Sequence, residues 1–227
     1  MEKSRTPNTS PESEVCAQFA DLGVATVYEA SGRQGLIDIP LTPLVPGSRI
    51  AGPARTVYCG QGDNRAVHEA VASVLPGEVL VLTMPTPAPV ALIGELLATQ
   101  AKQQGAAAML VDAAVRDVEE LQALGLPIWT RWTRARGATK TQRGEVNASI
   151  IVGGTRIEPG DIVILDSDGA VAVSESNVGE VLHASLARRE KEEALRRRYE
   201  SGALSYDMYG MRLEDQAADT IPAGVQA

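Results

Sequence analysis

Segment 94–120 combines an acidic side chain, a predicted helix start and an arginine followed by an aspartate. It opens with Gly94-Glu95, continues as a helical-looking ATQAKQQGA, and ends with a buried-looking strand, AAAMLVDAAV, that leads into Arg116-Asp117. Free N–H groups at a helix start attract anions. An arginine offers a two-pronged fork to a carboxylate, and an aspartate offers a hard oxygen to a divalent metal. Together these groups could hold a small keto acid next to Mg²⁺ or Mn²⁺.

Two interpretations of the Arg116-Asp117 pair stay open at this point. An arginine beside an aspartate at the end of a strand can be a simple ion pair with no further role. Ligands of α/β proteins usually collect where strands end, which favours a functional role. Twenty residues (96–115) separate Glu95 from Arg116, so a helix and a strand would have to bring them together.

Other catalytic arrangements have little support in the sequence. It lacks the GxSxG, Walker, CxxC and HExxH motifs, and its two histidines, His68 and His183, are too few for a histidine-rich metal site or triad. Lys102 and Lys140 lie among polar neighbours, which gives weak support to a Schiff-base aldolase, although Lys140 could reach an anionic substrate. Carboxylates are the remaining metal ligands, and they favour Mg²⁺ or Mn²⁺.

The elements that must position these residues can be read from periodicity and turn signals. Apolar residues at helical spacing in 14–31 predict two short helices, divided at Gly23. Segment 84–92 reads as a proline-rich loop that delivers the chain to Gly94, and VEELQALGLPIWTR reads as a helix, a glycine stop and a strand. We expect further strands in RTVYC, LPGEVLVL, SIIVGG, TRI, DIVILD and GAVAV, and helices in AVHEAVASV and from Ser176 to Arg198.

Composition limits the class of protein. The chain has 227 residues, 44% of them hydrophobic, with Phe19 as its single phenylalanine, and a net charge of −8. An acidic chain argues against nucleic-acid binding through a general basic surface. Cys16 and Cys59 lack paired spacing, so we expect thiols in a reducing cytosol. The polar N-terminus and the absence of an apolar run of about 20 residues predict a cytoplasmic protein without a membrane partner.

The same segment also carries a resemblance to a known family. GELLATQAKQQGAAAMLVDAAVRDVEE, together with GVATVYEASGRQGL, IAGPARTV, EPGDIVILDSDGAVAV and DMYGM, resembles the class II 4-hydroxy-4-methyl-2-oxoglutarate / 4-carboxy-4-hydroxy-2-oxoadipate aldolases. It also resembles the related regulator-of-ribonuclease-E-activity-A-like proteins. The resemblance runs over roughly residues 20–212, and the DMYGM block is closer to the aldolase branch.

The resemblance implies an α/β fold of the layered α/β/β swivelling type with a C-terminal helical extension, assembled as a trimer or a dimer of trimers. We therefore expect a disordered tail over residues 1–13 and a single α/β/β catalytic domain over 14–175. Residues 176–227 would form a helix and a tail that packs on a neighbouring subunit. The Tyr and Met residues of SYDMYGMRLEDQ are apolar groups of the kind that pack on a neighbouring subunit or on the body of the same chain.

The resemblance also assigns roles to particular residues. Asp117 would ligate Mg²⁺ or Mn²⁺, and Arg116 would hold the carboxylate and the C2 oxygen of a pyruvate unit. The remaining expected participants are the backbone N–H groups of Leu96 and Leu97, which would bind the same carboxylate, and Glu29 and Glu192 of an adjacent subunit, which would order metal-bound water. Among the residues EKEE, the match to Glu192 has neighbouring alternatives.

Glu95 departs from the family pattern, which commonly has aspartate at this position. A glutamate adds one methylene, and a misplacement of about 1 Å can cost on the order of 100-fold in rate. Glu95 could preserve proton handling as a catalytic residue, change the substrate preference, or mark a divergent member.

The implied reaction is metal-dependent cleavage of a 4-hydroxy-2-oxo di- or tricarboxylic acid to pyruvate and a second oxo acid, as in the degradation of aromatic compounds. Oxaloacetate decarboxylation is an expected side activity. The alternative is a non-enzymatic protein that binds and inhibits a ribonuclease, and a third possibility is the same chemistry in a different pathway. The Arg116-Asp117 pair is shared by both branches, so the aldolase-like C-terminus decides in favour of the enzyme.

Overall fold

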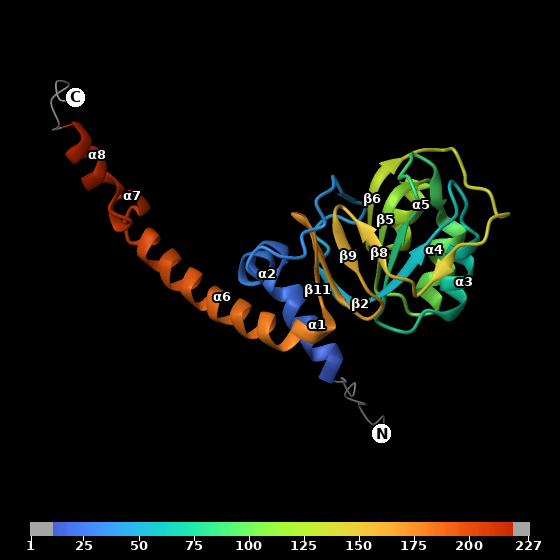
Figure 1. Cartoon of the computed structure of the whole chain (residues 1–227), viewed down its shortest axis with the longest axis horizontal. Helices are drawn as coiled ribbons and strands as arrows, with labels where there is room; N and C mark the ends of the chain where they lie inside the picture. Colours follow the sequence, from blue (N-terminus) through green and yellow to red (C-terminus); the bar gives the residue numbers. More distant parts are fainter. Residues whose placement is uncertain (1–10, 220–227) are drawn as a thin grey trace, which may run out of the picture. The chain divides into compact units, whose positions relative to one another are not determined.

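The computed structural model describes residues 11–219 (Figure 1), which divide after Ser185 into two compact units. The first unit contains a nine-stranded mixed sheet and most of the helices, and the second contains C-terminal helices. The sheet order is β1-β6-β5-β3-β2-β10-β11, with β4 beside β5 and β7 beside β2. Its strands are β1 Thr42–Pro43, β2 Ile50–Tyr58, β3 Val79–Thr83, β4 Ala91–Ile93, β5 Ala108–Val115, β6 Ile128–Thr133, β7 Glu145–Val146, β10 Ile162–Asp166 and β11 Gly169–Val173.

The central strands β2, β3, β5 and β6 run parallel, and they are buried on both faces. Alternate residues of β3 and β5 enter two different apolar clusters. Leu80 and Met109 pack with α3 (Arg65–Ser73), α4 (Glu95–Gln103) and α5 (Val118–Leu124), whereas Val81 and Leu110 pack on the opposite face. A period of two with both faces apolar is what a parallel sheet covered on both sides requires.

A second β layer covers the face of the sheet that lacks helices α3 to α5. It consists of the hairpin of β8 (Ile150–Val152) and β9 (Thr155–Ile157), whose buried residues share a cluster with β10 and β11. Helices, sheet and hairpin thus form three layers (Figure 1). The expected α/β fold is confirmed.

Most of the elements predicted from the sequence are present. The helices divided at Gly23 are α1 (Pro11–Leu22) and α2 (Val24–Ala30). Gly23 has φ +80°, and a Cβ there would lie 2.9 Å from the Asp166 carboxylate that accepts the Val24 N–H, so only glycine fits this junction. The loop predicted over 84–92 is wrong at its end, because residues 91 and 92 belong to β4.

The second unit is helical. It is entered through α6 (Val178–Glu200), after a short 3₁₀ turn at Glu175–Asn177, and continues through α7 (Ser205–Met208) and α8 (Met211–Asp219). Arg212 ties α7 to α8, since it pairs with Asp207 and stacks over the Tyr206 ring at 4.7 Å. Packing of this tail on a neighbouring subunit stays a prediction. Across residues 11–219, none of the helices is long and apolar enough to cross a membrane.

Trp129 joins β6 to β10 on the face of the sheet that the hairpin covers. Its side chain is fully buried in the cluster that contains Val163 and Leu165, and its indole N–H donates to the Asp166 carbonyl at 2.8 Å. This bond connects β6 with the end of β10, which lie on opposite sides of the centre of the sheet order. The contact therefore helps to hold the curved sheet around its second core.

We expect Trp129→Phe to lower the free energy of unfolding by about 2–3 kcal/mol, because it leaves a cavity and an unpaired carbonyl. Urea unfolding at neutral pH measures this loss. Trp132→Phe is the matched control, since that ring is only partly buried and should cost under about 1 kcal/mol. Equal losses in the two variants would contradict the role given to Trp129.

Candidate functional site at the ends of β4 and β5

Two neighbouring parallel strands deliver the candidate residues to one edge of the sheet. β3 pairs with the first half of β5, up to Leu82 beside Val111, and β4 then takes its place beside Ala114 and Val115. The Arg116 N–H donates to the Ile93 carbonyl at 3.1 Å, which continues this pairing by one residue. The structure thus brings Glu95, which follows β4, next to Arg116 and Asp117, which follow β5.

Asp117 is held in an uncommon backbone conformation. Its φ and ψ are 60° and 49°, the left-handed region, and it occupies the N-cap position of α5. For a residue with a side chain this conformation costs roughly 1–2 kcal/mol, and such strain clusters at functional sites. The Asp117 Oδ2 accepts the Glu95 backbone N–H at 3.1 Å and lies 3.7 Å from the Arg116 Nε.

Arg116 is enclosed by two glycines. A Cβ on Gly94 would lie 2.5 Å from the Asp117 Oδ2 and 3.1 Å from the Arg116 Nε, and a Cβ on Gly137 would lie 2.8 Å from the Arg116 Nη1. Contacts this short would displace the charged groups. The absence of a side chain at both glycines thus lets the two backbone segments approach the Arg116 and Asp117 side chains closely.

The start of α4 offers backbone donors beside this pair. The first hydrogen bond inside the helix runs from the Ala98 N–H to the Gly94 carbonyl at 3.1 Å, so the N–H groups of Leu96 and Leu97 have no partner within the helix. The Glu95 carboxylate accepts the Thr99 hydroxyl at 3.0 Å. Binding of a carboxylate by the Leu96 and Leu97 N–H groups stays a prediction that this geometry permits.

An open hollow of about 600 Å³ lies at this edge of the sheet. Arg116 and Asp117 are both about half exposed there, with side-chain exposures of 51% and 41%. These values leave both charged groups accessible to a small ligand. The hollow is lined by Arg116, Asp117, Val118, Glu119, Thr133, Arg134 and Ala135.

Asp63, which lies just before α3, anchors the loop that contains Gly137. Its fully buried carboxylate accepts the Thr139 hydroxyl at 2.6 Å and the backbone N–H groups of Arg65, Thr141 and Gln142. Burial alone would raise the pKa of Asp63, but these hydrogen bonds outweigh it and hold the pKa well below its usual value. The loop is thereby fixed beside Arg116.

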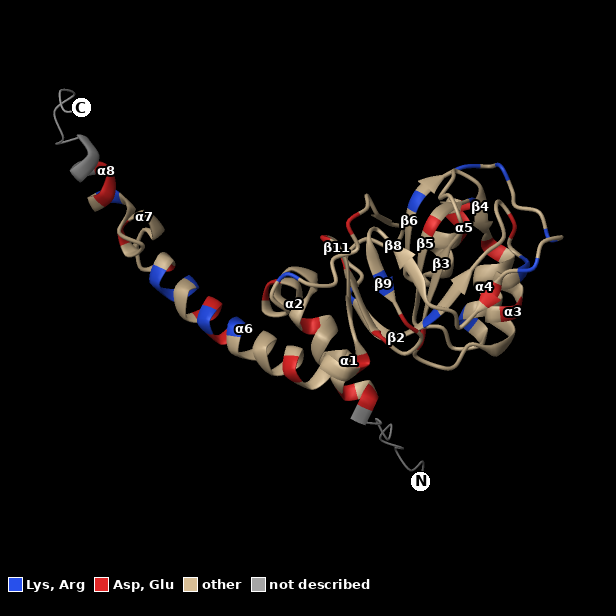
Figure 2. Cartoon of the chain, in the orientation of Figure 1, with Lys and Arg blue, Asp and Glu red and all other residues tan. Residues whose placement is uncertain are grey.

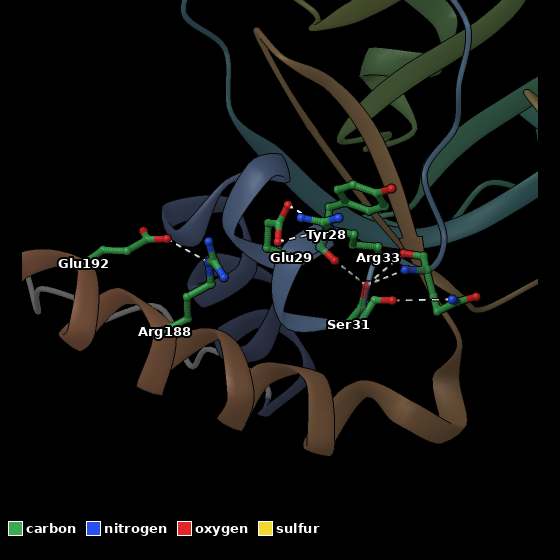
Figure 3. A network of polar contacts seen from close by, with 8 residues as sticks. Tyr28, Glu29, Ser31, Arg33, Arg188 and Glu192 are labelled. Carbon is green, nitrogen blue, oxygen red and sulfur yellow. Dashed lines mark hydrogen bonds and ion pairs between the residues drawn. The ribbon is translucent and has the colours of Figure 1, made fainter. Parts of the chain in front are cut away.

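Glu29 is not brought to Asp117 by the contacts within the first unit. Glu29 lies in α2, which packs against β10 and β11 at the opposite part of the sheet, and it pairs with Arg33 at 3.3 Å (Figure 3). Glu192 lies in the second unit and pairs with Arg188 at 2.7 Å. Their predicted role at the site of an adjacent subunit stays a prediction.

Asp117 is the candidate metal ligand of this site, and Glu119 is the other carboxylate residue that lines the hollow. Residues 11–219 contain no cluster of three or more histidine, cysteine or carboxylate side chains that could hold a metal ion. Mg²⁺ and Mn²⁺ fit such a donor set, because Mg²⁺ keeps several waters and binds through one or two carboxylates, and Mn²⁺ prefers the same oxygen ligands. A zinc site, which needs three or four protein ligands, does not fit.

Comparisons with known proteins agree with this architecture. The model of the RraA-like family (Aldolase/RraA) matches residues 19–172. The chain belongs to this family. It is 30% identical over 198 residues to a Halalkalibacterium halodurans protein whose provisional name is 4-hydroxy-4-methyl-2-oxoglutarate aldolase, covering 87% of this chain and 94% of that relative.

Solved structures of the RraA-like family share the fold. Streptomyces coelicolor RraAS2, described as an unusual member of the RNase ES inhibitor RraA family, is 28% identical with a TM-score of 0.71, covering 84% of this chain and 99% of that one. The RNA-processing inhibitor RraA from Thermus thermophilis is 27% identical with a TM-score of 0.56, covering 61% and 82%. The family thus includes proteins named as an aldolase and as inhibitors.

Sequence reasoning found the Arg116-Asp117 pair but missed its supports. Gly94 and Gly137 are ordinary glycines in the sequence, and their close approach to Arg116 depends on strands that are distant in the chain. Asp63 lies two residues before α3, and its bond to the Arg65 N–H is a local contact of that helix start. Its bonds to residues 139–142 have no local signal.

The pKa of Asp63 gives a stability prediction with a defined sign. Because this pKa is lowered on folding, the carboxylate stabilises the protein above its unfolded pKa of about 4, and the stabilisation is lost as the pH falls further. Asp63→Asn should lower the free energy of unfolding by about 1–3 kcal/mol at pH 7. The difference from the wild type should shrink at pH 3.

Urea unfolding at the two pH values measures this difference. Asp168→Asn, an exposed aspartate in the turn between β10 and β11, is the control and should cost under about 0.5 kcal/mol at both. A loss for Asp63→Asn that is the same at pH 7 and pH 3 would show that the carboxylate charge is not what stabilises the loop.

Proposed function

We propose that the protein is a divalent-metal-dependent aldolase that cleaves a 4-hydroxy-2-oxo di- or tricarboxylic acid to pyruvate and a second oxo acid. The observation that carries the proposal is the convergence of the α4 start with Arg116 and a strained Asp117. The aldolase name of the relative with 30% identity supports the same reaction class. Oxaloacetate decarboxylation is the proposed side activity.

The keto-acid end of the substrate would bind between Arg116 and the start of α4. The guanidinium group can pair with the C1 carboxylate and contact the C2 oxygen, while the Leu96 and Leu97 N–H groups face an anion with the positive end of the helix dipole. Gly94 and Gly137 leave the space that the Arg116 side chain occupies beside the start of α4.

Asp117 would hold Mg²⁺ or Mn²⁺, and Glu29 and Glu192 of adjacent subunits would order the water around the ion. This arrangement requires a homo-oligomer, for which we propose a trimer or a dimer of trimers. A bound divalent ion supplies Lewis-acid polarisation of the C2 carbonyl. The Glu95 N–H, which donates to the Asp117 Oδ2, fixes the carboxylate orientation for this task.

Glu95 would take the proton from the C4 hydroxyl, directly or through one water. As that proton leaves, the C3–C4 bond breaks, a carbonyl forms at C4, and the bonding electrons pass into the C2 carbonyl to give the enolate of pyruvate. Arg116 stabilises the negative charge that develops on the C2 oxygen. Protonation at C3 then yields pyruvate. The Thr99 hydroxyl, 3.0 Å from the Glu95 carboxylate, orients the base.

Arg116→Ala and Asp117→Ala should each lower kcat/KM for 4-hydroxy-4-methyl-2-oxoglutarate by at least about 1,000-fold, because each removes a charge that acts on the reacting carbonyl. Pyruvate release with Mg²⁺ or Mn²⁺, followed with a coupled reductase, measures the loss. Arg143→Ala and Asp168→Ala, which alter exposed residues outside the hollow, are the matched controls. Wild-type protein that releases no pyruvate from this acid or from oxaloacetate would refute the proposed enzyme.

Glu95→Gln tests whether the Glu95 carboxylate acts as the base. Aldol cleavage should fall by about 100-fold or more, since the C4 hydroxyl proton loses its acceptor. Decarboxylation of oxaloacetate forms the same enolate without removing a hydroxyl proton, so its rate should stay within a few fold of the wild type. Equal losses in the two reactions would assign Glu95 to binding or structure instead.

The second candidate function is that of a protein-binding inhibitor of a ribonuclease. It is favoured by the 28% identity to Streptomyces coelicolor RraAS2. Inhibition of a ribonuclease of the E type by the purified protein, without metal-dependent pyruvate release from either oxo acid, would support this function in place of the aldolase.

A further inference from the structure

The loop after β6 concentrates positive charge in an acidic protein. Residues 131–144, the end of β6 and the loop after it, contain Arg131, Arg134, Arg136, Lys140 and Arg143 and no aspartate or glutamate, whereas the whole chain has a net charge of −8. Figure 2 shows blue segments along this loop. A local cluster of one sign beside a hollow raises the local concentration of ligands of the opposite charge.

Most of these cations are not used in structural ion pairs. Arg131 pairs with the buried Asp112 at 2.9 Å and stacks over Trp132, so it belongs to the sheet. The other four side chains are exposed, and within residues 11–219 none of them forms an ion pair. Of these four, Arg134 lines the hollow that contains Arg116 and Asp117.

The backbone fixes Arg134 beside the proposed catalytic pair. Its N–H donates to the carbonyl of Val115, the residue directly before Arg116, at 3.0 Å. Its Nη1 donates to the Thr133 carbonyl at 2.7 Å, and Thr133 also lines the hollow. The bond to Thr133 therefore positions the Arg134 guanidinium group at the wall of the hollow. Its other N–H groups can donate to an anion.

We propose that Arg134 binds the second carboxylate of a dicarboxylic oxo acid, the one distant from the keto group. This inference rests on the proposed function, which places the keto-acid end at Arg116. Asp117 and Glu119 line the same hollow and would repel a second carboxylate. Arg134 is positioned to offset that repulsion, and so makes the site selective for diacids over monoacids of the same length.

Binding of two non-cleavable ligands tests this selectivity without depending on turnover. 2-Oxoglutarate and 2-oxopentanoate have the same five-carbon chain and the same keto-acid end, and they differ in the distal carboxylate. Isothermal titration calorimetry with full-length protein and Mg²⁺ should give a Kd about 10- to 100-fold lower for the diacid, as expected for one charge-assisted pair.

Arg134→Ala should remove this preference by raising the Kd for 2-oxoglutarate alone. The Kd for 2-oxopentanoate should stay within about twofold of the wild-type value. Arg134→Lys should retain part of the preference, because it keeps the charge and loses the planar fork. Arg143→Ala, an exposed and unpaired cation of the same loop, is the control and should bind both ligands as the wild type does. Circular dichroism checks the fold of each variant, and Arg134→Gln replaces Arg134→Ala if the latter unfolds.

Three results would overturn the inference: no diacid preference in the wild type, equal weakening of both ligands by Arg134→Ala, or the same loss of preference in Arg143→Ala. Pyruvate release is measured separately on the same samples. A diacid preference that depends on Arg134, without any pyruvate release, would refute the proposed reaction and keep the carboxylate site. Pyruvate release without a diacid preference would support the proposed reaction and refute the carboxylate site at Arg134.

Discussion

The pairing of β4 with the last residues of β5 is the contact on which the site depends. β3 stops beside the middle of β5, and the short β4 takes over the same edge, so that Gly94 and Arg116 emerge side by side. The hydrogen bond from the Arg116 N–H to the Ile93 carbonyl extends this register into the site. Without the pairing of β4 with β5, the start of α4 would not lie next to the end of β5. The backbone N–H groups of the helix start would then have no arginine or aspartate near them.

Burial of the sheet stabilises the fold by more than the strained backbone of Asp117 destabilises it. β5 is buried along its whole length, in two apolar clusters, and it ends directly at Arg116. Burial of several large side chains contributes on the order of 2 kcal/mol each, which exceeds the cost of the left-handed Asp117. The loop after β6 is held by a different means, the buried Asp63 carboxylate, because a segment rich in cations and glycine has little apolar surface to bury.

The distribution of charge favours attraction of an anion at short range only. The protein is acidic as a whole, which disfavours anions at long range, but salt limits that effect to about 10 Å. At shorter distance a ligand at the proposed site would meet Arg116, Arg134 and the positive end of a helix dipole. Arg116 is paired with Asp117, so the exposed cations of the loop after β6 are the ones that would supply further positive charge to an anion there.

The sequence by itself determined the elements and the chemical types. The periodicity around Gly23, the burial pattern of 108–115 and the helix after Asp117 were all predictable, because each depends on residues close together in the chain. The tertiary structure alone decided the rest. A three-residue strand after prolines has no local signal, so β4 was missed, and with it the reason that Glu95 meets Asp117. The contacts of Gly137 with Arg116 and of Asp63 with the loop after β6 join residues separated by tens of positions, and only the folded sheet sets such distances.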